Sequence, residues 1–261
     1  MTGVDNPVLP GEQWDAVDAF EPKAHNWWVA LEHLGRYLFA AKLLRSEGAT
    51  RVLDAACGTG FGAAELAREG LHVTALDGDQ EILDYAAARY PSDRIAYRLV
   101  DLDHELPPAL AGDGSFSGAV SFETLEHLVA PEQTLRRLAA LLAPGSPFIC
   151  SFPIRGAEST NAQGLPSNAA HKQRWSLDGG VRLLESAGFE IEYRLGQSWV
   201  ARLMKREIQL KRKHQIAAAP SSFAATKDPD ELRSWAHLLA IPSPEDVEES
   251  YSQVLVARRS G

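Results

Sequence analysis

The stretch Arg51–Leu66 restricts the possible folds of this chain more than any other part of its sequence. A short apolar segment, Arg51–Ala55, stops at a glycine-rich turn, and a helical pattern begins at Phe61. The apolar segment has the length of a buried strand and is too short for a helix. Glycines allow the backbone to approach a ligand closely, and the free N–H groups at a helix start can face that ligand. The stretch therefore predicts the strand, turn and helix that open a nucleotide-binding α/β domain.

The glycine spacing in this turn narrows the choice of ligand. Gly58, Gly60 and Gly62 alternate with other residues, whereas dinucleotide-binding folds use Gly-x-Gly-x-x-Gly to place a pyrophosphate on the helix N-terminus. This difference disfavours a nicotinamide-dependent oxidoreductase. A tight turn that binds no ligand would need similar glycines, so the glycines alone do not identify a ligand.

The segment Val52–Gly60 resembles the first motif of class I S-adenosylmethionine (SAM)-dependent methyltransferases. The resemblance implies an α/β, Rossmann-like fold with a seven-stranded sheet, and it implies SAM as the cofactor. Gly58 and Gly60 would then lie against SAM. Because SAM carries a zwitterionic methionine tail and no pyrophosphate, the carboxylate of Asp54 suits the ammonium group of that tail.

The composition favours a globular protein of a reducing compartment. The chain has 261 residues, 45% of them hydrophobic, and no apolar run reaches the roughly 18 residues of a membrane span. Only two cysteines and an N-terminus without a signal-peptide pattern predict a cytoplasmic protein with no membrane association. The net charge of −9 disfavours nucleic-acid partners. The oligomeric state stays open, with a homodimer as one alternative.

The apolar spacing divides the chain into an N-terminal arm with a lid helix, 1–48, and a SAM-binding domain, 49–261. The lid helix is expected over His25–Arg45. Residues 196–250 are expected to form a helical insertion between the sixth and seventh strands, where the fold ordinarily needs only a hairpin. The basic helix expected at Trp199–Ile216 is either a solvated surface or part of a substrate lid or dimer contact. We expect the part from Trp199 to Ala240 to pack as helices over or beside the cofactor-binding face.

The rest of the pattern alternates strands and helices. Strands are expected at 51–55, 71–76, 95–100, 116–122, 147–152, 189–195 and 251–257. Asp77 ends the second strand, where a carboxylate can accept both hydrogen bonds of a ribose diol. Asp77 therefore predicts a nucleoside ligand without choosing between cofactors.

The resemblance implies further cofactor contacts. Glu32–Ala40 is similar to the region before the first strand of sugar-modifying and ubiquinone-pathway methyltransferases. An arginine there commonly meets the SAM carboxylate, which implies this role for Arg36. After the third strand, an aspartate of the family receives the adenine amino group, and the next backbone N–H reaches the ring. The resemblance implies these roles for Asp101 and Leu102, and Asp103 is the alternative to Asp101.

A second group of polar residues follows the fourth strand. Phe122, which ends this strand, is expected beside SAM, and Glu123, Glu126 and His127 come directly after it. Ligands of α/β sheets bind at this carboxyl end. If the stretch is helical, the three polar side chains share one face. Two carboxylates and an imidazole suit Mg²⁺ or Mn²⁺, and His127 alone suits a general base.

The segment Ser121–His127 resembles a group of methyltransferases that act on sugars, on ubiquinone precursors and on the 2′-oxygen of small RNAs. Some of them hold a divalent ion with Glu-x-x-Glu-His, and the RNA enzymes add a histidine in a His-x-x-x-Trp context, which is His171–Trp175 here. The metal site that this resemblance implies consists of Glu123, Glu126, His127 and His171. Related SAM enzymes carry similar residues without a metal, so Glu126 as a helix cap and His127 as a base stay open.

These patterns predict SAM-dependent methyl transfer to a hydroxyl of a small polar acceptor that bears a sugar or a diol. The hydroxyl proton would be lost either to His127 or through a metal ion that lowers the pKa of the hydroxyl. The alternatives are N-methylation of a small amine, 2′-O-methylation of RNA, and a SAM-binding interaction protein without catalysis.

Overall fold

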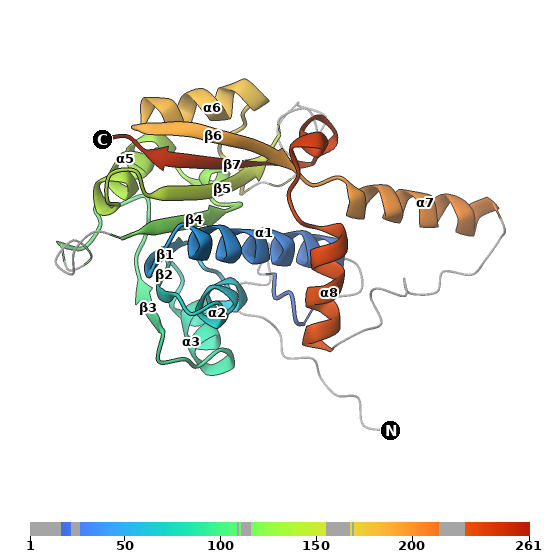
Figure 1. Ribbon diagram of the computed structural model, residues 1–261, viewed down its shortest axis with the longest axis horizontal. Coiled ribbons are helices and arrows are strands. Elements are labelled where there is room, and N and C mark those ends of the chain that lie inside the picture. The colour runs from blue at the N-terminus through green and yellow to red at the C-terminus, as the bar shows by residue number, and fades with distance from the viewer. Residues whose placement is uncertain are drawn as a thin grey trace.

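A seven-stranded sheet forms the centre of the chain (Figure 1). The computed structural model describes residues 17–21, 27–108, 110, 116–154, 168, 170–213 and 228–261. The strands are β1 Arg51–Ala55, β2 His72–Asp77, β3 Ile95–Leu99, β4 Gly118–Phe122, β5 Pro147–Pro153, β6 Phe189–Gly196 and β7 Ser252–Arg259. Their order is β3-β2-β1-β4-β5-β7-β6, and only β7 runs antiparallel to its neighbours. The predicted α/β fold with seven strands is confirmed.

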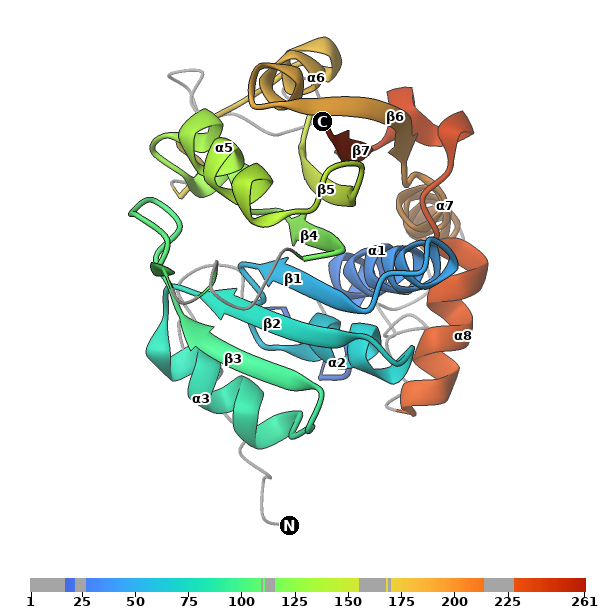
Figure 2. The same cartoon turned by 60° about the vertical axis from the view of Figure 1, so that its left-hand side comes forward.

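Helices cover both faces of the sheet (Figure 2). One face carries α1 Trp27–Ser46, α2 Phe61–Arg68 and α3 Gln80–Arg89, and the other carries α5 Pro131–Leu141 and α6 Leu177–Ser186. Neighbouring residues of β1 point to different cores: Val52 packs with the first group of helices and Leu53 with the second. Strands that are buried on both faces, such as β1, β4 and β5, appear in the sequence as continuous apolar runs. For this reason their positions could be predicted from the sequence.

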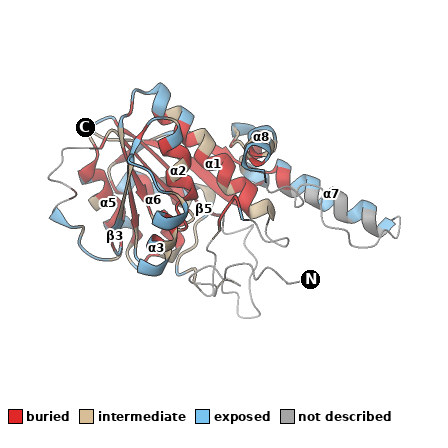
Figure 3. Cartoon of the chain, turned by 90° about the horizontal axis from the view of Figure 1, so that it is seen from below, coloured by how far each residue is buried: buried red, intermediate tan, exposed pale blue. Residues whose placement is uncertain are grey.

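The insertion between β6 and β7 consists of α7 Trp199–Lys213, α8 Pro229–Leu239 and a 3₁₀ helix, η3 Pro244–Glu249. Helix α8 lies against α1 and adds Leu232 and Ala236 to the first core. Helix α7 instead projects from the body of the protein, with Trp199, Leu203 and Leu210 exposed (Figures 1 and 3). The expectation that all of residues 199–240 pack over or beside the cofactor face therefore needs correction for α7.

Helix α1 is a core helix, which corrects the expectation of a lid at the surface. Ten of its residues are buried, among them Leu34, Tyr37 and Leu44. Gly35 lies so close to α8 that a Cβ added to it would be 2.1 Å from the carbonyl oxygen of Ala240. The polar side chains of Glu32 and Arg36 on this helix are buried as well, at 3% and 2% exposure.

A short part of the N-terminal arm, 17–21, is anchored beside the glycine turn. The hydroxyl of Thr59 donates to the carbonyl of Val17 at 2.7 Å. Asp18 is buried and accepts hydrogen bonds from the hydroxyls of Tyr85 and Tyr90 at 3.0 and 2.7 Å. The first sixteen residues of the predicted arm lie outside the described residues.

Two further sequence expectations concern cysteines and membranes. Cys57 and Cys150 are both buried and form no disulfide. Within the described part of the chain, no helix combines the length and the apolar character that crossing a membrane requires.

We predict that Gly35→Ala lowers the free energy of unfolding by about 1–3 kcal/mol, because the new methyl group overlaps the backbone of Ala240. Urea denaturation measures the change. Gly179→Ala in α6 is the matched control: its nearest neighbour is the flexible side chain of Ser176 at 3.2 Å, so the helix preference of alanine should make it neutral or stabilising. Equal stability of both variants would contradict the tight α1–α8 contact.

Candidate active site

The glycine turn after β1 is tied to the end of β2. The backbone N–H of Gly58 donates to Asp77 Oδ2 at 2.9 Å, and the N–H of Cys57 donates to the carbonyl of Leu76 at 2.7 Å. Gly58 is left-handed, with φ of 52°, and a Cβ added to it would meet no atom within 4 Å. A side chain at Gly60 would instead collide with Ala86. Gly58 therefore faces open space, as a ligand-binding glycine must.

Asp54 is a fully buried carboxylate with an incomplete set of partners. Its Oδ1 accepts a hydrogen bond from the hydroxyl of Tyr37 at 3.1 Å, and its Oδ2 has no donor among the described residues. Burial raises the pKa of Asp54 to about 7, and the nearby charge of Asp77 adds to this, while the Tyr37 hydrogen bond opposes it. A cation beside Oδ2 would satisfy both the charge and the missing hydrogen bond.

Asp77 is half-buried at the end of β2, and each of its oxygens accepts one backbone hydrogen bond. The donors are the N–H groups of Gly58, at 2.9 Å, and Asp79, at 3.1 Å. Burial raises the pKa of Asp77, and these backbone donors oppose the rise. Because a carboxylate oxygen has two lone pairs, both oxygens can still accept from the hydroxyls of a ribose.

The residues expected at the adenine lie further along the same edge. The Asp101 side chain is exposed; its oxygens accept from the N–H of Asp103 and pair with His104 Nδ1, both at 2.9 Å. The backbone donor at Asp103 lowers the pKa of Asp101. Leu102 is buried, and its carbonyl accepts from the hydroxyl of Thr134 at 2.8 Å.

The side chain of Phe122 is part of the core. Its ring packs edge-on against Tyr37, with centroids 4.9 Å apart. The Phe122 ring would therefore influence a cofactor only indirectly, by packing on Tyr37. A direct contact would involve the backbone at the end of β4.

Arg36 lies in the core, where it meets Glu123. Its guanidinium is 2% exposed, and Nη1 lies 2.9 Å from Glu123 Oε1. The same nitrogen donates to the hydroxyl of Ser151 at 3.2 Å, and Nε donates to Gln197 Oε1 at 2.7 Å. The family resemblance implied that Arg36 meets the methionine carboxylate of SAM. In the structure Arg36 is instead paired with the carboxylate of Glu123.

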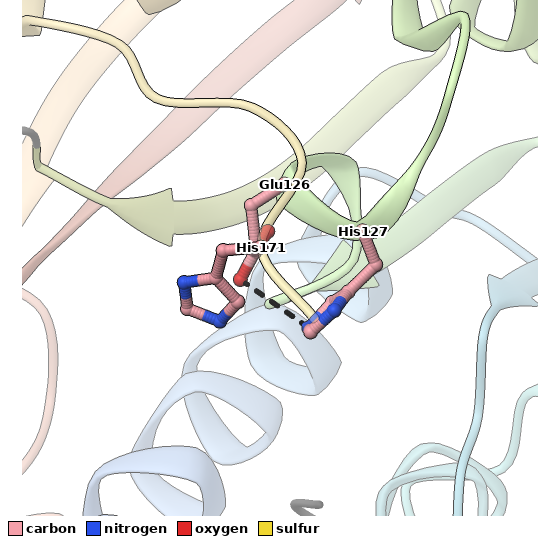
Figure 4. A group of neighbouring side chains, drawn as sticks. All are labelled: Glu126, His127 and His171. Atoms are coloured by element: carbon pink, nitrogen blue, oxygen red, sulfur yellow. Dashed lines mark ion pairs between the residues drawn. The ribbon is translucent and has the colours of Figure 1, made fainter. Parts of the chain in front are cut away.

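Glu126, His127 and His171 come together at the carboxyl end of the sheet (Figure 4). One potential ligand atom of each lies within 4.8 Å of the others. The two rings are 4.8 Å apart and nearly perpendicular. The carbonyl of Glu126 accepts from the N–H groups of Lys172 and Gln173 at 2.7 and 3.0 Å, so the turn after β4 holds the segment that carries His171.

Glu123 does not belong to this group, which corrects the predicted set of four. The sequence assumed one helical face for residues 123–127, but only Leu125–His127 forms a 3₁₀ turn, and Glu123 is left-handed with φ of 50°. This conformation turns its side chain toward Ser151 and Ser252, whose hydroxyls donate to it at 2.7 and 2.9 Å. Glu123 therefore faces the sheet and Arg36.

The sequence analysis missed several residues that shape the site. Tyr37 binds Asp54, and its ring fills the place where a Cβ of Gly62 would lie, 2.0 Å away. Gly62 is therefore needed for this aromatic ring, and that glycine was the sequence signal for a bulky neighbour. Ser151 and Gln197 carry no local signal, because their partners are distant in the sequence.

The fold defines the class of Rossmann-like α/β proteins, with the carboxylates of Asp54 and Asp77 near the ends of β1 and β2. A family model described as "Methyltransferase domain" matches residues 53–150. A probable S-adenosylmethionine-dependent methyltransferase of Mycolicibacterium smegmatis is 30% identical over 80% of this chain and 81% of its own. The ubiquinone biosynthesis O-methyltransferase of Xanthomonas axonopodis pv. citri is 29% identical over 67% of this chain and 84% of its own.

The chain belongs to the SAM-dependent methyltransferases. Among solved structures, the cyclase SpnF has a TM-score of 0.58 and 22% identity, and the match covers 92% of this chain and 86% of that one. This likeness shows the shared fold alone. The chain is an enzyme that uses SAM, and the family does not by itself define its acceptor.

We predict that the affinity for S-adenosylhomocysteine falls as the pH drops below about 7, by up to about tenfold per pH unit. Only the ionised form of Asp54 attracts the ammonium group, and a raised pKa means that this form is lost near pH 7. Calorimetry between about pH 5.5 and 7.5 measures the effect. Asp54→Asn is the control: its binding should be weaker and independent of pH. A constant wild-type affinity would remove Asp54 from the amine site.

We further predict that Gly58→Val abolishes binding of S-adenosylhomocysteine while the protein stays folded, because the new side chain fills the open space at the turn. Gly48→Val is the matched control. Gly48 is also left-handed, with φ of 75°, and a Cβ there also meets no atom within 4 Å. Both variants should lose about 1–2 kcal/mol of stability to backbone strain. Normal binding by the Gly58 variant would exclude this turn from the cofactor site.

Proposed function

We propose that this enzyme transfers a methyl group to a hydroxyl of a small polar acceptor that bears a sugar or a diol, including a catechol-like pair of hydroxyls. The observation that carries the proposal is the group formed by Glu126, His127 and His171 after β4. A hydroxyl nucleophile must lose a proton, and this group is suited to remove one. Relatives named as O-methyltransferases of ubiquinone biosynthesis support an oxygen acceptor.

The cofactor would be held by residues at the ends of β1 and β2. Asp54 would bind its ammonium group, Gly58 would lie against its chain, and Asp77 would accept from its ribose. Bound SAM supplies an activated methyl group on a sulfonium. The task left to the protein is to align the acceptor oxygen, exclude water and take up the proton.

His127 is oriented for the role of base. Its Nδ1 lies 3.3 Å from the carbonyl oxygen of Ala170, and because a carbonyl can only accept a hydrogen bond, this neighbour favours the tautomer with the proton on Nδ1. The basic nitrogen is then Nε2, which lies 3.9 Å from Glu126 Oε1. A buried carboxylate beside the ring stabilises the positive charge that forms when the imidazole accepts a proton.

The same group offers a second candidate for proton removal, a divalent metal ion. Because Glu123 is paired with Arg36, the remaining donors are one carboxylate and two imidazoles, which suit Mn²⁺ better than Mg²⁺. Ligand atoms bound at about 2.0–2.2 Å lie at most about 4.4 Å apart, so the group would contract slightly from 4.8 Å around an ion.

We predict that His127→Gln lowers kcat about 10²–10⁴-fold, because general-base catalysis contributes that much, while affinity for S-adenosylhomocysteine stays unchanged. His72→Gln is the matched control, since His72 is exposed at the first residue of β2, whereas the candidate site lies at the other end of the strands. Treatment with EDTA followed by Mn²⁺ separates the two candidates. Loss and recovery of activity indicate the metal, and indifference to EDTA leaves His127 as the base. Full activity of the His127 variant would reject both.

The acceptor is tested by mass spectrometry with SAM that carries a labelled methyl group. Sugars, polyols, catechols and small amines are offered to the purified enzyme together with RNA. Label on a hydroxyl of a small molecule supports the proposal. Label on a nitrogen or on RNA would replace it with N-methylation or RNA 2′-O-methylation.

A further inference from the structure

We propose that Arg36 and Glu123 are positioning residues that set the placement of His127 relative to His171 from the buried side of the turn. The inference rests on the proposed role of His127, but its test does not require that role. Within the described residues, the ion pairs and hydrogen bonds of Arg36 and Glu123 lead to α1, β5, β7 and Gln197. Their influence passes through the backbone of the turn after β4.

Glu123 connects this turn to three other elements. Arg36 of α1 forms an ion pair with Oε1 at 2.9 Å, Ser151 of β5 donates to the same oxygen at 2.7 Å, and Ser252 of β7 donates to Oε2 at 2.9 Å. The backbone N–H of Glu123 also donates to the carbonyl of Ser151 at 3.0 Å. Burial alone would raise the pKa of Glu123, but Arg36 and the serine hydroxyls lower it below its usual value.

The contacts of the Glu123 side chain are needed to hold its backbone in the left-handed conformation. A residue other than glycine rarely adopts a φ of 50° unless its surroundings impose it. The direction of the chain at Glu123 sets where Leu125–His127 begins. The carbonyl of Glu126 then holds the segment that carries His171 through two backbone N–H groups. The placement of both histidines thus depends on a strained residue that its side-chain partners hold.

Arg36 also links this turn to the insertion. Gln197, at the start of the insertion, accepts from Arg36 Nε at 2.7 Å and donates to the carbonyls of Glu32, at 2.9 Å, and Ala240. Gln197 precedes α7 and Ala240 follows α8, so the start of α7 and the end of α8 meet near Gln197. The nearest competing carboxylate is Glu32, whose Oε2 is 3.9 Å from Arg36 Nη2. Without the charge of Glu123, Arg36 would be drawn to Glu32 and away from the turn.

The test is nuclear magnetic resonance on protein with isotopically labelled histidine. The wild type should show a nuclear Overhauser contact between the rings of His127 and His171, assigned with His127→Gln and His171→Gln. In Glu123→Gln we expect this contact to be lost. Binding of S-adenosylhomocysteine should stay unchanged in the same sample.

Glu65→Gln is the matched control. The Glu65 side chain is 3% exposed, against 16% for Glu123, and Arg233 of the insertion pairs with it at 2.7 Å. Among the described residues this pair lies between α2 and α8, away from the turn after β4. This variant should lose stability to a similar extent and keep the ring contact. If the control loses the contact as well, general loosening explains the effect and the inference is overturned.

A double variant protects the test against unfolding. Arg36→Met combined with Glu123→Gln removes both charges of this ion pair together. Glu32 loses Arg36 as its neighbour, but burial already raises the pKa of Glu32 to about 7, so that this carboxyl can take up a proton. The double variant should fold and still lose the ring contact. A folded double variant with unchanged histidine resonances would overturn the inference. If His127 turns out not to take part in methyl transfer, the proposed function is rejected. The dependence of the His127–His171 ring contact on Glu123 would still stand.

Discussion

A sheet buried on both faces is the constraint on which this site depends. Neighbouring residues of β1 and β4 face two separate apolar cores, so an unpaired polar side chain on either face would be costly. Polar chemistry is therefore concentrated at the carboxyl edge, where strands end in turns. Ala56 and Glu123, the described non-glycine residues with left-handed backbones, directly follow β1 and β4 at this edge.

Three carboxylates with little or no exposure, those of Glu65, Glu123 and Asp54, differ in how their charges are paired. Glu65 is paired with Arg233, and Glu123 is paired with Arg36, so each negative charge is neutralised within the chain. Asp54 has a tyrosine hydroxyl on one oxygen and no donor among described residues on the other. Asp54 is therefore the carboxylate of the three whose charge an ammonium group of a ligand would neutralise.

The parts of the site that could be predicted lie next to strand ends in the sequence. The glycine turn, Asp54 and Asp77 follow directly from short apolar runs that stop at turn residues. His127 and His171 could be paired because β4 and β5 are adjacent and parallel, so the segments after them emerge at the same edge. Glu123 could not be placed, because the pattern of three residues suggested a helix while the backbone there is left-handed.

By itself the sequence determined the alternation of strands and helices, the glycine turn after β1 and the family, since periodicity and turn chemistry are local properties. Tertiary structure alone decided which partner each charge takes. Arg36 had SAM, Glu32 and Glu123 as possible partners, and packing of α1 against β4 selected Glu123. The same holds for the insertion, where α8 packs on Gly35 and α7 projects from the body. Such choices depend on distances between segments far apart in the chain, which no local pattern encodes.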